Sequence, residues 1–205
     1  MAVISNGTTL IDAGALGASA GAGKMTLIKT LTASSSATLT FHNGASSVVL
    51  DSTYDSYLFL LINMHPSNDN SRFSFQVNAA GASGFNETIS CVSFDAYQNE
   101  SGSGAGVEFS AGLSQAQGTA FQEFSAGIGN NNDDSTCGYL QLFNPSSTTF
   151  VKHFIGNTDT SYTSGLQVNW KNAGYINTTN AIDEIQFKME SGYIDSGIIK
   201  MYGIG

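Results

Sequence analysis

The sequence has few charged residues and very few basic ones. Charged side chains make up 11% of its 205 residues, with 16 Asp and Glu against 7 Lys and Arg. Soluble domains usually carry roughly 25% charged residues, and exposed helix surfaces depend on Glu, Lys and Arg. The low charge therefore disfavours a helical fold. The net charge of −9 repels phosphate groups and anionic lipids, so we expect neither nucleic acid nor a membrane as a partner.

Long apolar segments are also missing. The longest run, residues 57–62, has the length of a strand, whereas crossing a bilayer takes roughly 18 apolar residues. The first residues have no basic group ahead of an apolar stretch, so we expect no secretory signal. We therefore predict synthesis and assembly in a cytoplasm.

The sequence offers little for metal binding or catalysis. Cys91 and Cys137 form no CxxC pair, and we expect both to be reduced thiols in the core. The three histidines stand apart, without the HxH or HxxxH spacing of metal ligands. Neither a GxSxG elbow nor a complete phosphate-binding loop occurs. We predict a protein that is not an enzyme and has no metal or cofactor.

Two stretches rich in Asn and Asp, residues 68–70 and 130–135, offer oxygen atoms of the kind that bind calcium. Neither has the spacing of an EF-hand. Because Asn and Asp also form turns by bonding their own backbone, we interpret both stretches as solvated turns.

The rest of the chain is patterned for β-strands. In residues 72–78, large apolar side chains alternate with polar ones, as in a strand with one buried face. Residues 57–64 are apolar on both faces, which is typical of a central strand covered on each side. After an alternating run that ends at His42, the pair Asn43-Gly44 predicts a hairpin turn.

Similar short runs, separated by clusters of Gly, Asn, Asp and Ser, continue to the C-terminus. We predict further strands at residues 48–50, 87–94, 107–109, 121–128, 138–143, 149–155, 166–170, 182–189 and 197–202. No stretch has a sustained helical period. The predicted fold is therefore all-β, an antiparallel β-sandwich that is jelly-roll-like, in one domain over residues 26–205.

Residues 1–25 differ from the rest in composition. Gly, Ala and Ser dominate them, so few side chains are available to offset the entropy cost of ordering the chain. We predict a flexible N-terminal arm that attaches to a neighbouring protein. Its apolar residues are the candidates for this contact: Val3, Ile4, Leu10, Ile11 and Leu16.

One group of aromatic residues is a candidate for ligand contact. Trp170, the one tryptophan, lies near Tyr162 and Tyr175 in the sequence. Aromatic rings among Asn and Asp side chains can stack on sugar rings, but the core of a sandwich also needs large aromatic residues. These three residues are therefore candidates for contact with a host surface glycan or a partner protein, and a place in the core is the alternative.

Four segments resemble a known group of proteins: residues 27–36, 51–57, 143–147 and 191–204. They are similar to segments of small virion-associated proteins of marine tailed phages, over most of residues 26–204, and the last segment is the most specific. The resemblance implies a β-sandwich that decorates the capsid or belongs to the tail or its fibres. It also implies a homo-oligomer, with a trimer favoured, and other virion proteins, the major capsid or tail proteins, as partners. It implies no catalytic residues.

Two functions follow as the main hypotheses, with a hydrolase that acts on host polysaccharide as a remote third. The first is a structural virion protein, a capsid decoration or tail-associated protein that self-associates and docks on other virion proteins. The second is a receptor-binding module of a tail or head fibre, in which Trp170 and nearby loops hold a host glycan. Both place the protein in the virion. Because the shared motifs are strand and turn chemistry, they predict the fold more directly than the role.

Overall fold

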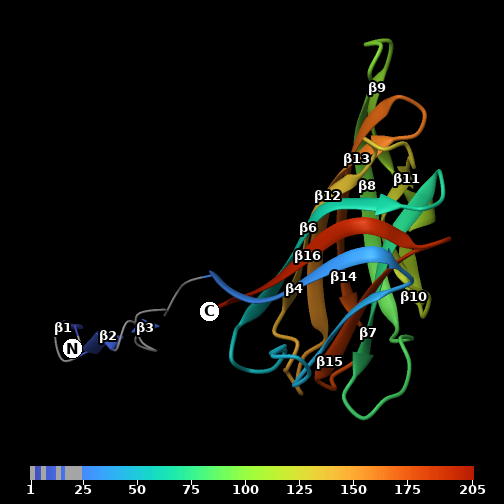
Figure 1. Ribbon diagram of the computed structural model, residues 1–205. Coiled ribbons are helices and arrows are strands. Elements are labelled where there is room, and N and C mark those ends of the chain that lie inside the picture. Colours follow the sequence, from blue (N-terminus) through green and yellow to red (C-terminus); the bar gives the residue numbers. More distant parts are fainter. Residues whose placement is uncertain (1–2, 6–7, 13–14, 17–24) are drawn as a thin grey trace.

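The computed structural model describes residues 3–5, 8–12, 15–16 and 25–205. Almost all regular structure in these residues is antiparallel β-sheet, which confirms the predicted all-β fold (Figure 1). The helical element among them is a short 3-10 turn, η2 (Ala111–Leu113). This part of the chain contains no helix of the length and apolar character that crossing a membrane requires.

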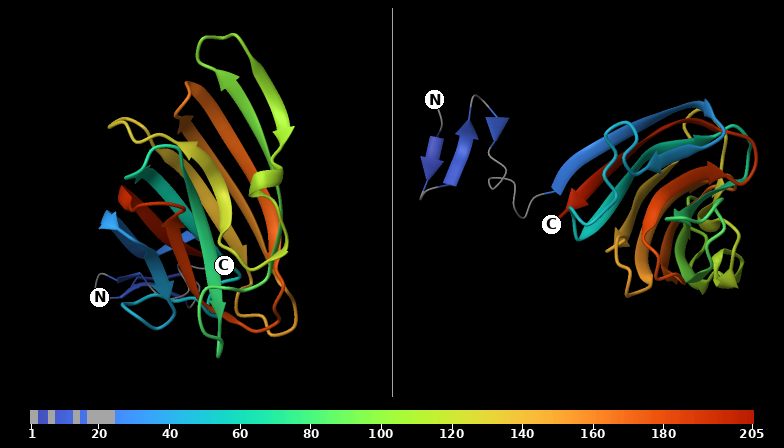
Figure 2. Two further views of the ribbon diagram at one scale, coloured as in Figure 1. Left: turned by 90° about the vertical axis from the view of Figure 1, so that its right-hand side faces the viewer. Right: turned by 90° about the horizontal axis from the view of Figure 1, so that it is seen from below.

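Two antiparallel layers form a sandwich-like sheet (Figure 2). The larger layer contains, in spatial order, β4 (Met25–Ser36), β16 (Ile194–Ile204), β6 (Ser56–Pro66), β12 (Thr136–Phe143), β13 (Lys152–Tyr162), β14 (Leu166–Ile176) and β8 (Ile89–Asn99). The smaller layer contains β11 (Gln122–Ile128), β7 (Ser71–Ala79), β15 (Ile182–Met189) and β5 (Leu39–His42). Ile128 of β11 pairs with Tyr162 of β13, and this pairing makes the two layers continuous.

Two short strands pair with β8 along the edge opposite to β14. β9 (Ala105–Phe109) pairs with the C-terminal half of β8 and forms the projecting hairpin at the top of Figure 1. β10 (Gln115–Gly118) pairs with the beginning of β8. The η2 turn connects the two, and the backbone N–H of Ser110 donates to the carbonyl of Ser93 at 3.0 Å. This bond fixes the connection against the middle of β8.

Phenylalanine rings from both layers fill the core. Phe73 and Phe75 of β7 pack on Phe124 and Phe187, with ring centroids 5.4 to 6.4 Å apart. Phe75 also meets Phe154 of the opposite layer, at 5.1 Å. These rings are at most 1% exposed, and each stabilises the fold by roughly 1.5 to 3 kcal/mol. The apolar side chains that alternate in residues 72–78 therefore form the centre of the core.

The polar face of β7 is buried as well, whereas the sequence predicted a half-buried strand. Gln76 is fully buried. Its Nε2 donates to three backbone carbonyls at 3.0 to 3.2 Å, those of Glu87, Thr119 and Ala120. These carbonyls belong to the loop after β7 and to the segment before β11, which together cover this face of the strand. They supply the hydrogen bonds that a buried amide requires.

Strand β6 lies between β16 and β12, as predicted for a central strand. The expectation that both of its faces are covered is wrong for the described chain. Leu58, Leu60 and Ile62 point away from the core and are only half-buried. The larger layer therefore carries apolar residues on its outer face.

The hairpin predicted at Asn43-Gly44 does not form. Gly44 does adopt a positive φ of 79°, as a turn requires. The chain then enters an irregular segment, and β5 pairs with β15 instead of with the following strand. The strand predicted at residues 48–50 is absent, because Val48 and Leu50 are buried from a loop.

Three short strands lie within the predicted arm: β1 (Val3–Ser5), β2 (Thr8–Asp12) and β3 (Ala15–Leu16). They form an antiparallel sheet that we did not predict, and among the described residues no β-ladder joins it to the thirteen-stranded sheet. The five candidate attachment residues fall on these strands. Of their side chains, that of Ile4 is described and is 61% exposed. Residues 1–2, 6–7, 13–14 and 17–24 of the predicted arm lie outside the described part.

The two cysteines are free thiols in different surroundings. Cys91 is buried in the core, as predicted, and burial raises the pKa of its thiol, which keeps it protonated and unreactive. Cys137 is only half-buried, and its thiol donates to Asn63 Oδ1 at 3.3 Å. The prediction of a core position is therefore wrong for Cys137.

Candidate functional site

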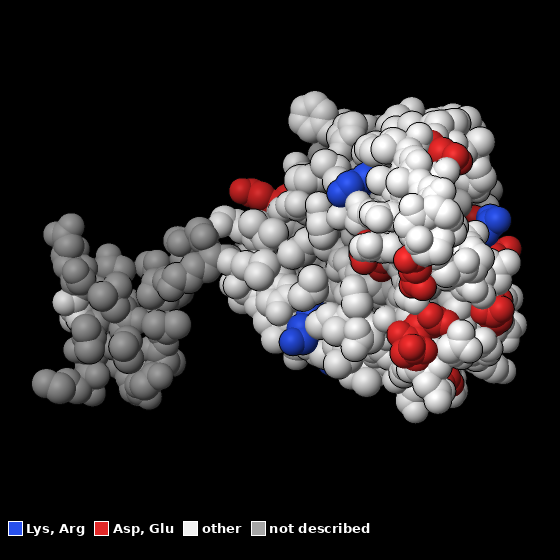
Figure 3. Space-filling view, turned by 90° about the horizontal axis from the view of Figure 1, so that it is seen from above, with Lys and Arg blue, Asp and Glu red and all other residues white. Residues whose placement is uncertain are grey.

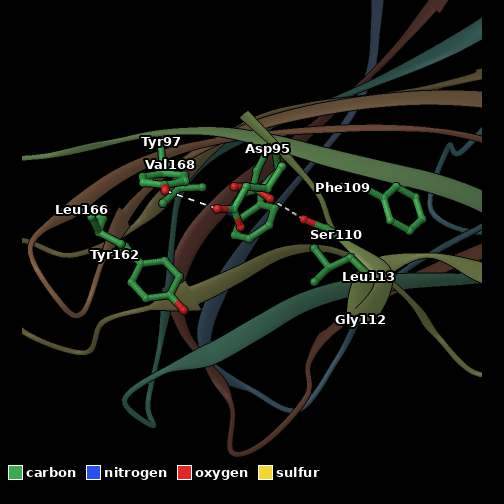
Figure 4. A pocket seen from close by; sticks show the side chains of 11 residues that line it. Asp95, Tyr97, Phe109, Ser110, Gly112, Leu113, Tyr162, Leu166 and Val168 are labelled. Carbon is green, nitrogen blue, oxygen red and sulfur yellow. Dashed lines mark hydrogen bonds between the residues drawn. The ribbon is translucent and has the colours of Figure 1, made fainter. Parts of the chain in front are cut away.

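A pocket opens on the inner face of the larger layer, beside β9 and η2 (Figure 4). Its volume is about 490 Å³, within the range of roughly 300 to 1,000 Å³ that is usual for small-molecule sites. Strands β8 and β14 form its back wall, and β9, η2 and the end of β13 complete it. The pocket combines an apolar floor, aromatic walls and two carboxylates.

The floor of the pocket is a small hydrophobic cluster separate from the main core. Val168 and Trp170 of β14, Leu113 of η2 and Ala126 of β11 are each at most 7% exposed. Alternating residues of a strand share one face, so β14 presents both Val168 and Trp170 to the pocket. Trp170 Nε1 is buried without a hydrogen-bond partner in the described chain.

Two tyrosine rings form the walls. In Figure 4, Tyr97 and Tyr162 stand together on one side of the pocket, opposite Ser110 and Leu113. A Cβ atom at Gly106 would lie 2.9 Å from the Tyr97 ring, and one at Gly127 would lie 1.8 Å from the Tyr162 ring. Each ring therefore occupies space that only a glycine leaves free.

The polar groups of the pocket are mainly acceptors. Asp95 is 7% exposed, and its Oδ1 accepts a hydrogen bond from the Ser110 hydroxyl. Glu108, the cross-strand partner of Asp95, accepts a hydrogen bond from the Tyr97 hydroxyl at 3.3 Å. The negative charge of Glu108 raises the pKa of Tyr97, so this hydroxyl remains a neutral donor. Of the described residues that line the pocket, none is Lys, Arg or His.

The structure brings together two of the three aromatic residues that the sequence suggested. Trp170 and Tyr162 line the pocket, whereas Tyr175 does not. The Tyr175 hydroxyl accepts a hydrogen bond from Gln117 Nε2 at 3.1 Å. Tyr175 is an odd number of residues from Trp170 on the same strand, so the two point to opposite faces. Period-two alternation could have excluded Tyr175 from the sequence alone.

Sequence reasoning missed Asp95, Tyr97 and Glu108. Asp95 lies opposite Trp170 across the pairing of β8 with β14. Tyr97 lies opposite Val168 in the same ladder. These partners are far apart in the chain, and no local pattern indicates which strands pair. The register alone brings the carboxylates to the aromatic residues.

Both Asn- and Asp-rich segments form turns, as predicted, and the second of them, residues 130–135, contributes to a polar hollow of about 540 Å³. Asp134 accepts hydrogen bonds from Ser161 and Asn131. Asp69 accepts hydrogen bonds from the Thr163 hydroxyl. In residues 25–205 and the described strands before them, no three His, Cys, Asp or Glu side chains gather in a metal-binding group.

Exposed apolar side chains gather on the outer face of the larger layer. We call this set the outer apolar face: Val92, Phe94, Val107, Phe109, Tyr139 and Ile155, which are 36 to 73% exposed. Phe94 and Phe109 are direct cross-strand partners. Among the described strands, the charged residues that alternate onto this side are Lys171, Asp159 and Lys200. Figure 3, which looks down on the molecule, likewise shows few basic residues and separate acidic patches on a largely uncharged surface.

Comparisons with family models, with curated proteins and with solved structures gave no match to this chain. The features that bear on function are therefore the geometry of the pocket, the outer apolar face and the resemblance of the four sequence segments.

Proposed function

We propose that this protein is a non-enzymatic structural component of a tailed-phage virion, which self-associates and docks on other virion proteins. The outer apolar face is the observation that carries the proposal. Monomeric proteins rarely expose contiguous apolar patches of large area, and larger ones mark contact surfaces. A second copy of the chain is the partner that we assign to this face.

Burial of the outer apolar face is favourable for two reasons. Val107 and Phe109 are 73% and 65% exposed, so each removes much apolar surface from water when covered. The surrounding surface carries few strongly hydrated charges that must lose water on contact. The half-buried residues of β6 continue the apolar surface toward the centre of the layer.

The virion assignment is supported by the resemblance of residues 27–36, 51–57, 143–147 and 191–204 to phage virion proteins. A trimer is the favoured assembly, and repetition on a particle multiplies weak single contacts. The non-enzymatic part is supported by the same resemblance, which implies no catalytic residues. In the described chain, His42 pairs with Glu184, and His65 Nδ1 bonds the carbonyl of Asp134.

Sedimentation velocity of the wild-type chain and of two charge variants tests self-association. Val107→Lys and Ile155→Lys each place a charge on the outer apolar face. We expect a concentration-dependent wild-type oligomer and a shift toward monomer in both variants. Circular dichroism must show that the variants keep the β-fold.

Phe150→Lys is the matched control, because Phe150 is 68% exposed but lies in the loop before β13. This variant should associate like the wild type. A wild-type chain that stays monomeric, or an oligomer that neither charge disturbs, would contradict the proposal. Stoichiometry in purified particles then gives the place in the virion: hundreds of copies indicate the capsid, and a dozen or fewer indicate the tail.

The pocket favours a second candidate function, that of a receptor-binding fibre module. Its aromatic walls and carboxylates have the composition of a glycan site, and Trp170 and Tyr162 are among its residues. Particles that carry Tyr162→Ala distinguish the two candidates in a host adsorption assay. Loss of adsorption by intact particles supports receptor binding, and unchanged adsorption supports a purely structural role.

A further inference from the structure

We infer that the pocket beside η2 binds a neutral hexopyranose unit. The inference rests on the second candidate function, glycan binding, and names its ligand class. It is tested separately from self-association, because Phe109 is the one residue of the outer apolar face that also lines the pocket, and Val107 and Ile155 do not line it. Charge, hydrogen-bonding capacity and ring surfaces of the pocket each favour this ligand.

Charge restricts the ligand first. Asp95 and Glu108 are both in the lining, and the described lining residues include no basic side chain. An incoming carboxylate or sulfate would meet like charges without a compensating cation, and this costs free energy that grows as the pocket loses water. Acidic sugars are therefore disfavoured, and neutral sugars are accepted.

Hydrogen-bonding capacity then favours hydroxyl groups. The Asp95 carboxylate receives one hydrogen bond in the described chain, from Ser110, so it retains capacity to accept more. The Tyr97 hydroxyl donates to Glu108, whereas the Tyr162 hydroxyl, also in the lining, has no hydrogen-bond partner among the described residues. The pocket thus offers both acceptors and a donor. A sugar hydroxyl donates and accepts, so one ligand can satisfy both kinds of group.

Ring surfaces complete the match. Tyr97 and Tyr162 stand side by side on one wall (Figure 4), each held over a glycine. Held rings lose little conformational entropy when a ligand stacks on them. The apolar C–H face of a pyranose can pack on these rings while its hydroxyls reach Asp95 and Glu108.

An organic ammonium ion is the competing ligand, since carboxylates and aromatic rings also attract cations. The quaternary ammonium group of choline carries neither an N–H nor a lone pair, so it offers no hydrogen-bond partner to Asp95 or to the Tyr162 hydroxyl. It would also bind more weakly as salt rises, whereas a neutral sugar would not. Salt dependence therefore separates the two ligands.

Tryptophan fluorescence provides a direct assay, because Trp170 is the one tryptophan of the chain and lies in the pocket floor. The full-length protein is titrated with methyl glycosides of glucose, galactose, mannose and N-acetylglucosamine. Glucuronic acid, N-acetylneuraminic acid and choline complete the panel. We expect at least one neutral glycoside to saturate the signal at millimolar concentration, about the affinity of a single weak contact, with no change between low and high salt. The two acids should bind at least about tenfold more weakly.

Three variants locate the binding. Tyr162→Ala removes a stacking wall and should weaken neutral-sugar binding at least about tenfold, a difference of about 1.4 kcal/mol. Glu108→Gln keeps the shape of an exposed side chain and should reduce the discrimination against the acids. Tyr193→Ala is the control, because Tyr193 is 52% exposed and does not line the pocket.

Several results would overturn the inference. These are no response to any neutral glycoside, preferred binding of an acid, salt-sensitive binding of choline alone, or equal effects of Tyr162→Ala and Tyr193→Ala. Glu108 is exposed, so Glu108→Gln should not disturb folding. This variant therefore tests the site even if Tyr162→Ala fails to fold. Sedimentation of the same variants keeps the outcomes distinct: loss of sugar binding with intact self-association leaves the structural proposal standing.

Discussion

Asp134 holds the loop after β11 against β13. Its Oδ1 accepts a hydrogen bond from the Ser161 hydroxyl, and its Oδ2 accepts bonds from the backbone N–H and side-chain amide of Asn131, at 3.2 and 2.8 Å. Hydrogen bonds to a carboxylate favour its ionised form. They lower the pKa of Asp134 below its ordinary value of 3.8, and the bond from Ser161 has the largest effect.

The lowered pKa of Asp134 predicts acid sensitivity of this loop. The carboxylate stabilises the folded state above pH 3.8, its unfolded value, and this contribution is lost as the pH falls through the lower folded pKa. We expect Ser161→Ala to move the pKa of Asp134 back toward 3.8, as measured by NMR titration of the carboxyl carbon. Ser191→Ala, whose hydroxyl bonds Asn68 instead, should leave it unchanged. Identical titrations of Asp134 in both variants would contradict this account.

Single residues of the pocket show where sequence reasoning succeeds and where it ends. The lone tryptophan and Tyr162 were recognisable because large aromatic residues are few and conspicuous. Asp95 was not, since an isolated carboxylate on an alternating strand normally faces solvent. Only the pairing of β8 with β14 places it beside Trp170. The sequence contains Asp95 but does not indicate that Trp170 lies beside it.

At the level of strands, Gly174 allows β14 to pack between β8 and Phe154. A Cβ atom there would lie 2.3 Å from the Ser90 carbonyl oxygen and 2.8 Å from the Phe154 ring. We expect Gly174→Ala to lower the free energy of unfolding by about 2 kcal/mol or more, because the backbone of β8 must move. Urea denaturation measures the change.

Gly156 on the neighbouring strand β13 is the matched control. Its added Cβ would lie no closer than 3.5 Å to another atom, which is ordinary contact. Gly156→Ala should therefore change the free energy of unfolding by less than about 1 kcal/mol. Equal costs for Gly174→Ala and Gly156→Ala would show that close backbone approach is not what requires Gly174.

Strands were predictable where the alternation of apolar and polar residues is strong. Ile182–Met189 was predicted with the bounds that β15 has. Met25–Ser36 was missed, because its many Ser and Thr residues give little apolar contrast and pairing with β16 holds it in place. The segment at residues 48–50 shows the converse error, since apolar residues can also be buried from a loop.

On the scale of the whole molecule, the two layers use their faces differently. The inner faces form the main core and, beside η2, the smaller hydrophobic cluster that lines the floor of the pocket. Among the described residues, the outer face of the larger layer carries exposed apolar side chains. Composition predicted such a charge-poor surface, but only the register shows that the exposed apolar residues share one face. The described chain thus combines a completed core with an apolar surface that remains exposed, and we propose the latter as the contact surface.

Deleting residues 1–24 tests whether the N-terminal segment serves attachment rather than folding. In the described residues the sheet β1–β3 shares no β-ladder with the thirteen-stranded sheet, which begins at Met25. The pairing of Met25 with Ile204 closes β4 on β16 without residues 1–24. We therefore expect the shortened chain to keep its circular dichroism spectrum and melting temperature.

The same deletion should abolish incorporation into particles. If residues 1–24 supply one of several linked contacts with neighbouring virion proteins, removing them lowers the effective concentration of all the others and weakens docking by far more than one contact. Quantitative mass spectrometry of purified particles, with equal expression of both chains, measures the loss. Replacing Ile4, which is 61% exposed, with Asp in the full chain should reduce incorporation without removing the segment. Normal incorporation of the shortened chain would assign attachment to the sandwich, and a lowered melting temperature would make the segment part of the fold.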